Sequence, residues 1–507
     1  MNESFNVSAM LDGEQATQAL AGTLALWARP GLVIALNGEL GAGKSVLARA
    51  FIRALFKPGC ESDVPSPSFS LVQTYEETRI PVFHADLFRL SSAGEVAELG
   101  LGEMLQHHCG IVEWADRLPD PLGKDTLTIQ LSGSGQKRQA DLTANGGWVQ
   151  VLRRNALLEE FIGIKPFALG SRSFFEGDAS ARRYEKVIVE GEELLLMDMP
   201  QRPDGPKVKD GKPYSAIAHL AEGITPVIAI NRHLENHGYS APKTTKSDLA
   251  GGFALIEDLG DKVYGRMMLA GEDMREPLET AAGLLADMAQ RDWPESVEAA
   301  AGHSHRLMAY DRDALLIEVD LLPSWYVPYA KGKPATQEAL SAFAKSWERL
   351  LPYTQPEKRI WTLRDFHSPN LIWIPEREGL KRVGLIDTQD AVLGHPAYDL
   401  ASMTQDARVD ISEEMQDHIV AHYCMLREKQ GGFDGNAFLT SYAVLGAQRA
   451  TKILGIFARL SKRDGKHQYL KHMPRVSGYL KRNLSHPALV ELKAWYEAHV
   501  PEALAAV

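Results

Sequence analysis

Hydrophobic and polar residues follow two different rhythms along the first 150 residues. A short, continuous apolar run at 32–36 is typical of a strand buried on both faces of a parallel sheet. Apolar residues at helical spacing flank this run, and shorter apolar runs recur further along. Helices are expected at 19–28 and 46–56, and further strands at 80–83, 109–112 and 127–131. This alternation of strands and helices predicts an α/β sheet.

A polar stretch with several glycines, residues 132–147, interrupts this rhythm, and we place a domain boundary near residue 150. The residues that follow predict a helix at 153–161 and strands at 184–189, 193–197, 253–257, 371–374 and 383–386. From about residue 270 the pattern is otherwise mostly helical. We therefore expect an α/β domain over 1–150, a small β-rich lobe over 151–262 and a larger helical lobe over 263–507.

Composition and charge narrow the classes of function. A chain of 507 residues exceeds what one hydrophobic core usually supports, so more than one folding unit is expected. The 45% of hydrophobic residues excludes disorder along the whole chain. The net charge of −11 argues against strong, autonomous binding of nucleic acid, because nothing would offset repulsion by phosphates.

The cysteines and the apolar segments indicate the compartment. Cys60, Cys109 and Cys424 have no metal-like spacing, so free thiols in a reducing cytosol are expected. The sequence contains no run of about 18 apolar residues, which a membrane span would need. The first residues contain no basic segment followed by an apolar stretch, as a secretory signal would. We expect a cytoplasmic protein that does not associate with a membrane.

A phosphate-binding loop follows the first buried strand. Residues 38–45 read Gly-Glu-Leu-Gly-Ala-Gly-Lys-Ser, the P-loop pattern, between an apolar strand and a helix. Gly38, Gly41 and Gly43 let the backbone turn its N–H groups toward a phosphate, and the following helix adds its positive end. Lys44 would reach the β- and γ-phosphates, and the Ser45 hydroxyl would bind Mg²⁺. The pattern predicts that this domain binds ATP.

Two acids at the ends of later strands complete this first site. A P-loop enzyme needs a second carboxylate near Mg²⁺ and a group that orients water. Asp86 suits the first role and Glu113 the second. Taken singly, each acid could instead be an ordinary surface or capping carboxylate.

Together, these motifs resemble the TsaE family. They are the P-loop at 38–45, Val-Pro-Ser-Pro-Ser-Phe at 64–69, His-Ala-Asp-Leu-Phe-Arg-Leu at 84–90, and Val-Glu-Trp at 112–114. The resemblance covers about residues 10–140. It implies an ATPase that supports threonylcarbamoyladenosine synthesis on tRNA together with TsaB- and TsaD-like subunits, which would hold most of the tRNA. It also implies that Glu113 is the catalytic carboxylate and that 66–69 is a nucleotide-sensing loop.

A second constellation lies in the helical lobe. Asp365 and Asn370 have the D-x-x-x-x-N spacing of kinase catalytic loops, in which Asp orients the substrate hydroxyl and Asn binds Mg²⁺. Asp387, directly after a short strand, fits the second magnesium ligand. The layout of a small lobe and a larger helical lobe, with this loop, predicts a two-lobed protein-kinase-like α+β domain behind the α/β P-loop NTPase domain.

The small lobe offers weaker candidates for nucleotide binding. The turn at 177–183 contains Ser180, Arg182 and Arg183, and could cover phosphates with its backbone N–H groups while an arginine neutralises them. A plain β-turn is the alternative. Glu257 fits the hinge between the lobes, where adenine normally meets backbone groups.

Residues 155–485 resemble the aminoglycoside-phosphotransferase-like superfamily and, within it, AmgK-type sugar kinases. The motifs that carry this resemblance lie at 177–183, 197–200, 363–371, 384–391 and 448–460. The resemblance implies ATP- and Mg²⁺-dependent phosphorylation of the anomeric hydroxyl of N-acetylmuramic acid and N-acetylglucosamine in cell-wall recycling. It implies Asp365 as the catalytic base and Asn370 and Asp387 as the magnesium ligands.

Two departures from kinase patterns leave other interpretations open. Leu363 stands where a histidine is usual, and the strand at 194–197 has no lysine to pair with phosphates. The domain could therefore be a catalytically silent module that regulates the ATPase, or a kinase for another small hydroxyl compound such as an amino alcohol or an aminoglycoside. The basic segment 449–466 could be a solvated helix face or a clamp for a sugar carboxylate or a phosphate. A basic clamp favours the amino sugar over a cationic substrate.

Overall fold

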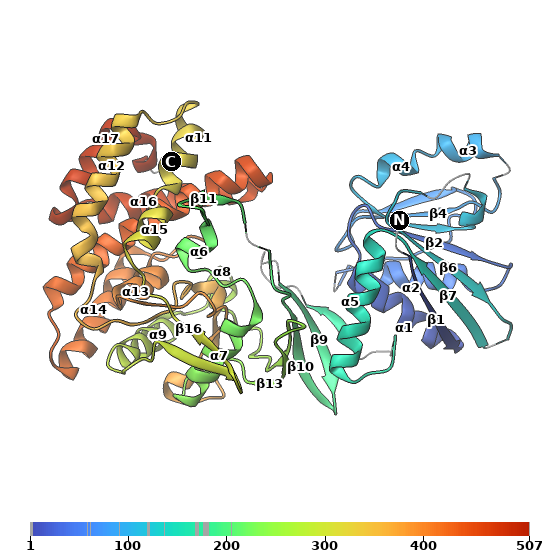
Figure 1. Ribbon diagram of the computed structural model, residues 1–507, viewed down its shortest axis with the longest axis horizontal. Helices are drawn as coiled ribbons and strands as arrows, with labels where there is room; N and C mark the ends of the chain where they lie inside the picture. The colour runs from blue at the N-terminus through green and yellow to red at the C-terminus, as the bar shows by residue number, and fades with distance from the viewer. Residues whose placement is uncertain are drawn as a thin grey trace. The chain divides into compact units, whose positions relative to one another are not determined.

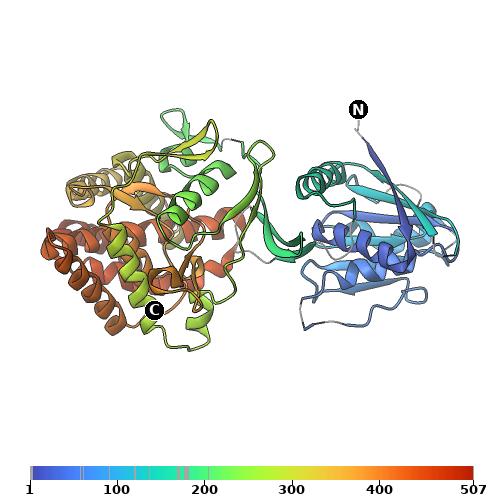
Figure 2. The same ribbon diagram turned by 90° about the horizontal axis from the view of Figure 1, so that it is seen from below.

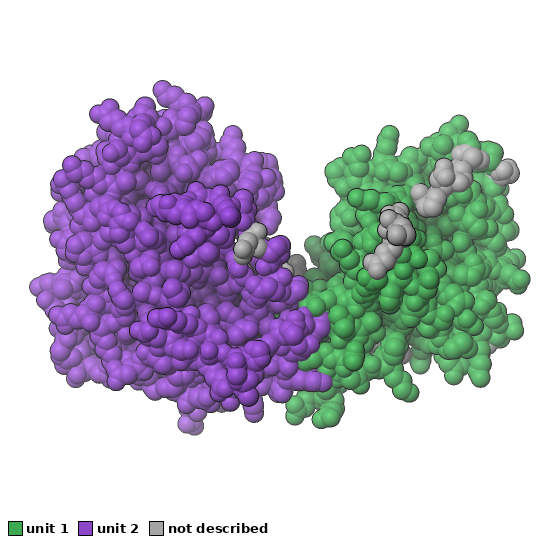
Figure 3. Space-filling model, in the orientation of Figure 1, with its two compact units in different colours: residues 1–198 green, residues 199–507 purple. Residues whose placement is uncertain are grey.

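A computed structural model describes residues 4–57, 59–60, 62–90, 92–118, 122–135, 137–167, 172–175, 182–203 and 205–505. The chain divides into two compact units, residues 1–198 and 199–507, which Figure 3 colours separately. Each unit has its own hydrophobic core. In this described part of the chain, no helix is long and apolar enough to cross a membrane.

A seven-stranded sheet forms the centre of the first unit (Figure 1). Its strands lie in the order β1-β7-β6-β2-β5-β4-β3. Their bounds are β1 (Phe5–Asp12), β2 (Val33–Gly38), β3 (Val72–Tyr75), β4 (Val82–Asp86), β5 (Cys109–Glu113), β6 (Thr126–Ser132) and β7 (Lys137–Ala144). β2 runs parallel to β5 and β6, and β4 runs parallel to β5. The carboxyl ends of β2, β4 and β5 therefore lie at the same edge of the sheet.

Helices cover the sheet and explain why the first four residues of its central strand, β2, are apolar. Ile34 and Leu36 of β2 pack into one core, and Val33 and Ala35 pack into a second core on the opposite face. The helices of this region are α1 (Gly13–Leu26), α2 (Lys44–Arg53), α3 (Ala93–Glu98), α4 (Leu101–Met104) and α5 (Gly147–Ile162). The predicted α/β sheet is confirmed, with strands and helices close to the expected positions.

Three strands of this sheet, β1, β3 and β7, are not predicted by the hydrophobic pattern. β1 and β7 pair with each other in antiparallel register from Phe5 opposite Ala144 to Asp12 opposite Lys137. In β7 only alternate side chains such as Ala140 and Leu142 reach the core, and polar residues occupy the positions between them. Because polar residues outnumber apolar ones in β7 and the preceding residues include glycines, the sequence pattern there is that of a loop and not of a strand.

The first unit continues beyond residue 150 into α5 and an antiparallel group of strands, β8 (Arg172–Phe175), β9 (Arg183–Val189) and β10 (Glu192–Asp198). The last two are the hairpin expected at 184–197. The packing boundary at residue 198 thus differs from the boundary near 150 that the polar, glycine-containing stretch indicates, and the three-part division of the chain stays a prediction.

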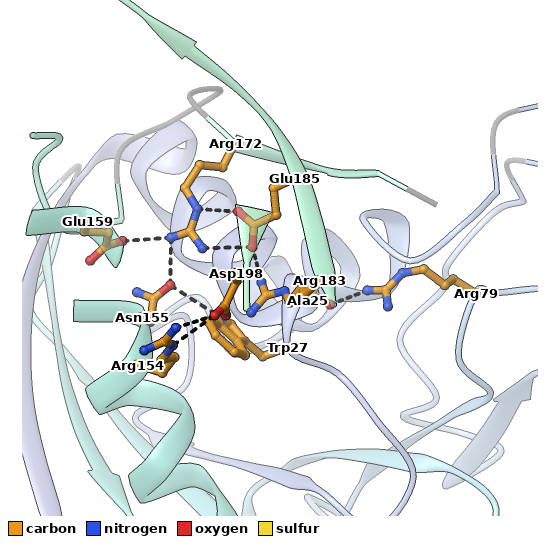
Figure 4. A network of polar contacts seen from close by, with 10 residues as sticks. All are labelled: Ala25, Trp27, Arg79, Arg154, Asn155, Glu159, Arg172, Arg183, Glu185 and Asp198. Carbon is orange, nitrogen blue, oxygen red and sulfur yellow. Dashed lines mark hydrogen bonds and ion pairs between the residues drawn. The ribbon is translucent and has the colours of Figure 1, made fainter. Parts of the chain in front are cut away.

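A buried polar network connects these later elements to α1 (Figure 4). The Trp27 indole, at the end of α1, donates to Asn155 Oδ1 of α5 at 3.1 Å. Arg172 of β8 donates to the same oxygen at 2.7 Å and to Glu185 Oε2 of β9 at 2.6 Å. Arg183 pairs with Glu185 and lies 3.3 Å from the centre of the Trp27 ring. These contacts explain why α5 and β8–β10 belong to the first unit.

The second unit is mostly helical. Its longest helix, α15 (Gly435–Asp464), packs against α13, α10 and α16, and the orange and red helices lie side by side in both views (Figure 1 and Figure 2). The other helices are α6 (Tyr214–Ala218), α7 (Ile224–Asn236), α8 (Tyr264–Leu269), α9 (Arg275–Met288), α10 (Arg312–Val319), α11 (Val327–Lys331), α12 (Gln337–Leu350), α13 (Ala397–Thr404), α14 (Glu413–Gln430), α16 (Met473–Asn483) and α17 (Val490–His499).

Short antiparallel strand pairs complete the second unit. The pairs are β11 (Lys207–Lys209) with β12 (Lys212–Pro213), β13 (Thr244–Asp248) with β14 (Phe253–Ile256), β15 (Ser296–Ala300) with β16 (His303–Arg306), β17 (Ile360–Thr362) with β20 (Val392–Gly394), and β18 (Leu371–Trp373) with β19 (Val383–Leu385). Three of these strands, β14, β18 and β19, coincide with predicted ones. The last two pairs frame the segment that contains Asp365, Asn370 and Asp387.

Candidate active sites

The P-loop in the first unit connects β2 to α2. Gly38, with φ of 141°, has no room for a side chain, because a Cβ atom would lie 2.4 Å from the Leu131 carbonyl oxygen. Gly43 caps α2 in the left-handed region, with φ of 104°. The sequence therefore needs glycine at both positions to bring the backbone around to the start of the helix.

Lys44, the first residue of α2, is almost fully buried at 4% exposure. Its ammonium donates to the carbonyl oxygens of Gly38 at 2.7 Å and Glu39 at 2.9 Å, and lies 3.5 Å from the centre of the Trp114 ring. Burial lowers the pKa of Lys44, against the opposing effect of nearby carboxylates, of which Glu113 is the strongest. The loop thus holds a positive charge close to its own backbone.

The predicted acids meet this loop at the edge of the sheet. Asp86 and Glu113 are paired in register at the ends of β4 and β5. Ser45 Oγ donates to Glu113 Oε2 at 2.7 Å. Asp86 accepts hydrogen bonds from Ser68 Oγ at 2.7 Å and from the Phe88 backbone at 3.0 Å. The structure therefore brings together the P-loop, both acids and the loop at 66–69.

His84 also belongs to this site, although the sequence pattern predicts no role for it. Its Nε2 lies 2.9 Å from Glu113 Oε1, and it is fully buried. His84 stands two residues before Asp86 on β4, so both side chains point to the same face of the sheet. That period of two, read from the sequence, could have indicated the contact.

The oxygen atoms of this site fit a magnesium nucleotide. Ser45, Asp86 and Glu113 offer hydroxyl and carboxylate oxygens, which are the donors that Mg²⁺ prefers. In the described part of the chain, no group of three or more His, Cys, Asp and Glu residues could hold a metal by itself. Mg²⁺ usually takes only one or two protein carboxylates and completes its shell with phosphates and water.

The second site is a loop between β17 and β18. The Asn370 amide donates to the Asp365 backbone oxygen at 3.0 Å, and the Ile386 backbone N–H donates to the Asn370 backbone oxygen at 3.1 Å. Asp387 follows directly, so the loop and the end of β19 place Asp365, Asn370 and Asp387 together. Arg364 and Asp387 both have positive φ, of 68° and 62°. Strained backbone of this kind persists where surrounding contacts hold it, and it is common at functional sites.

Two aspartates that were not predicted support this loop. Asp399 of α13 accepts hydrogen bonds from the backbone N–H groups of Leu363 at 2.6 Å and Arg364 at 2.8 Å. Asp406 accepts from the Ser368 backbone at 2.7 Å. Burial raises the pKa of Asp399 to about 7, and the two backbone donors only partly offset this effect. Both acids lie just after the predicted metal ligand Asp387 in the sequence, but nothing in their spacing marks a role.

A fully buried carboxylate, Glu318 of α10, holds the residue that precedes Asp365. Glu318 pairs with the Arg364 guanidinium and with Lys452 Nζ at 2.9 Å. Gln448 Nε2 donates to Glu318 at 3.0 Å, and the Tyr310 hydroxyl also donates to it. Burial alone would raise the pKa of Glu318, but these cations and hydrogen bonds lower it to about 2.

The same charges act on the predicted catalytic base. Burial would raise the pKa of Asp365, but His367 and Lys452 hold it below its usual value. Arg364 and Arg449 contribute in the same direction. Asp365 is therefore ionised at neutral pH and able to accept a proton from a hydroxyl group. The amide of Asn370 and the carboxylate of Asp387 supply oxygen donors that suit Mg²⁺.

The remaining predicted nucleotide contacts are Ser180, Arg183 and Glu257. Ser180 is outside the described residues. Arg183 is occupied by Glu185 and Trp27, and burial lowers its pKa to about 10. Glu257 follows β14 and pairs with Arg377 at 2.5 Å. The roles of these three residues in nucleotide binding stay predictions.

Comparison with known proteins gives two family matches. Residues 11–140 match the family of the threonylcarbamoyl adenosine biosynthesis protein TsaE, and residues 171–435 match the phosphotransferase enzyme family. The tRNA threonylcarbamoyladenosine biosynthesis proteins TsaE of Rickettsia bellii and Bacillus subtilis are 35% and 34% identical to this chain over 131 and 139 residues. These alignments cover 25% and 27% of this chain and 90% and 84% of the relatives.

The part of the chain that follows the P-loop domain matches a relative over nearly the whole length of that relative. The N-acetylmuramate/N-acetylglucosamine kinase of Caulobacter vibrioides is 37% identical over 359 residues, which cover 69% of this chain and 97% of that protein. A kinase with the same name from Neisseria meningitidis is 30% identical over 316 residues, 61% of this chain and 84% of the relative. These matches confirm the predicted fusion and the fold class. The chain is an enzyme that joins a TsaE-family ATPase domain to a kinase domain of the phosphotransferase enzyme family.

Proposed function

We propose that this protein is bifunctional. Its first domain hydrolyses ATP in support of threonylcarbamoyladenosine formation on tRNA, with TsaB- and TsaD-like subunits as partners. Its second domain transfers phosphate from ATP to the anomeric hydroxyl of N-acetylmuramate and N-acetylglucosamine in cell-wall recycling. Two observations support this proposal. The relatives are named as an N-acetylmuramate/N-acetylglucosamine kinase and as a tRNA threonylcarbamoyladenosine biosynthesis protein, and the two sites contain the groups that such reactions need.

The observation that carries the kinase proposal is the geometry of the catalytic loop. Asp365 is ionised, partly accessible and held by backbone contacts between its neighbours and Asp399. A silent kinase fold would have no need to keep Asp365, Asn370 and Asp387 together in a strained loop. The loop therefore favours an active phosphotransferase over a purely regulatory module.

The reaction is an in-line phosphoryl transfer. The anomeric oxygen forms a bond to the γ-phosphorus while the bond to the leaving ADP oxygen breaks, and the hydroxyl proton passes to the Asp365 carboxylate. Asn370 and Asp387 would hold Mg²⁺, which neutralises charge on the nucleotide phosphates. In the first domain, Ser45 and Asp86 would hold Mg²⁺, Lys44 would contact phosphate, and Glu113 would orient the attacking water.

Phosphate transfer by the full-length chain tests the kinase proposal. The acceptors are N-acetylmuramate, N-acetylglucosamine, choline and an aminoglycoside, and the phosphorylated product is identified by ³¹P NMR. Measuring product rather than ADP separates transfer from hydrolysis at the P-loop. We expect anomeric phosphate on the amino sugars, lost in Asp365→Asn but retained in Lys44→Ala. Transfer to choline or the aminoglycoside alone would replace the substrate class, and transfer to none would favour the silent module.

ATP turnover tests the first domain in the same chain. We expect hydrolysis without any sugar acceptor, stimulated by TsaB- and TsaD-like proteins and lost in Lys44→Ala. Hydrolysis that survives this substitution but is lost in Asp365→Asn would assign the turnover to the kinase site and contradict the proposal for the P-loop.

A further inference from the structure

One segment of α15 is fixed against the catalytic loop. Gln448 and Lys452 both contact Glu318, which in turn pairs with Arg364, the residue before Asp365. Ser402 of α13, the helix that packs against α15, donates to the Arg364 backbone oxygen at 3.3 Å. The stretch from 448 to 452 therefore has a defined position next to the proposed kinase site.

Arg449 lies within this stretch and is 6% exposed. Across the described residues, no side chain or backbone group forms a hydrogen bond or ion pair with its guanidinium. This sets it apart from Arg364 and Lys452, which share the carboxylate of Glu318. A buried charge without a hydrogen-bonded partner is costly, and natural proteins usually pair such groups. An anionic group supplied by a bound molecule would remove that cost.

Arg449 lines a small recess with Gln405, Gly446, Val476 and Tyr479. The packing around this recess is tight, because a Cβ atom on Gly446 would lie 2.7 Å from the Asn483 amide. Arg449 is also close enough to the catalytic loop to lower the pKa values of both Asp365 and His367. The same charge thus borders the recess and reaches the residue that would contact the acceptor hydroxyl.

The two amino sugars of the proposed function differ at one place. N-acetylmuramate carries a lactyl ether with a carboxylate, and N-acetylglucosamine has a neutral hydroxyl at that position. The planar guanidinium of arginine matches a carboxylate with two parallel hydrogen bonds. We propose that Arg449 binds the lactyl carboxylate of N-acetylmuramate and so determines the preference of the kinase for the acidic over the neutral sugar. This assignment rests on the proposed function.

Kinetic measurements on the full-length protein test this assignment. Arg449→Met keeps the length of the side chain and removes its charge. We expect kcat/KM for N-acetylmuramate to fall about 10- to 100-fold, the effect of losing a charged hydrogen bond, and kcat/KM for N-acetylglucosamine to stay within about threefold. Arg449→Lys should restore part of the loss. The matched control is Arg463→Met, at an exposed arginine of the same helix, which should leave both sugars unaffected.

A second measurement does not depend on how well the variants fold. The methyl ester of N-acetylmuramate lacks the negative charge, so the wild-type protein should use the ester about 10- to 100-fold less well than the acid. Arg449→Met should use acid and ester equally.

Three outcomes are distinguishable. Equal losses with both sugars in Arg449→Met, or equal use of acid and ester by the wild-type protein, would overturn the role of Arg449. They would instead indicate contact with the transferred phosphate or a structural role. A wild-type protein that phosphorylates neither amino sugar would overturn the proposed function itself.

Discussion

The buried carboxylate of Glu318 gives the sharpest test of how the second unit is held together. Glu318→Gln keeps the size of the side chain and leaves no cavity, but it removes the charge shared by Arg364 and Lys452. Breaking a buried ion pair by removing one partner typically costs about 3–5 kcal/mol, because the remaining charges are left uncompensated. The lowered pKa gives a similar magnitude, since a shift from 4.5 to about 2 corresponds to about 3 kcal/mol.

The sign of the pH dependence follows from this lowered pKa. The ionised form is favoured in the folded state, so the stabilisation by Glu318 is present above its unfolded pKa of about 4.5 and is lost as the pH falls toward 2. At pH 7 the full effect of Glu318→Gln should therefore be observed. The variant should also lose less stability than the wild-type protein on acidification.

Urea unfolding of the full-length protein, followed by tryptophan fluorescence, measures this effect, because six of the nine tryptophans lie in the second unit. The two units can unfold separately, so the transition of the second unit has to be fitted by itself. The control is Glu348→Gln, in which an exposed glutamate loses its pair with Arg312. Exposed pairs contribute little to stability, so only a small change is expected. Equal effects of the two substitutions would refute the reasoning.

Three further predictions concern other parts of the molecule. Glu113→Gln should lower ATP turnover at the P-loop about 10²- to 10⁴-fold while nucleotide affinity stays within a few-fold, as measured by steady-state hydrolysis and a fluorescent nucleotide; unchanged turnover would remove Glu113 from catalysis. Asn155→Leu should destabilise the first unit by about 1–3 kcal/mol in urea unfolding, because Trp27 and Arg172 lose an acceptor; a neutral result would show that water replaces it. Burial lowers the pKa of His395 from 6.5 to about 4, so the folded state favours the neutral imidazole. About 3 kcal/mol of stability should therefore be lost as the pH falls from 6.5 to 4. His395→Asn keeps an acceptor for the Ala397 N–H and should flatten this dependence of stability on pH.

Residues at strand ends and in short loops could be predicted from the sequence. Asp86 and Glu113 follow apolar runs that form adjacent parallel strands, and the carboxyl ends of such strands meet at one edge. Asp365, Asn370 and Asp387 lie within one short segment, so spacing alone places them near one another. In both sites the chemistry is encoded locally, and the structure brings these residues together as expected.

The groups that support these sites could not be predicted in the same way. Glu318 and Asp399 contact the catalytic loop from α10 and α13, and only the packing of these helices brings them there. A buried glutamate within an amphipathic helix has no periodic signature of its own. Its partners are known only once the tertiary contacts are known.

Arg183 shows how the same difference affects the boundary between domains. From the sequence, the turn that contains it could either cover phosphates, with the arginine meeting nucleotide, or be a plain β-turn. In the structure its guanidinium pairs with Glu185 and lies on Trp27, a residue of the P-loop domain.

A cut at residue 150 would separate Arg183 and Asn155 from Trp27 and leave part of this buried network without partners. Families are defined by motifs, but stable units are defined by packing, and the packing here extends to residue 198. The two activities are therefore best measured, and their possible coupling best tested, in the intact chain.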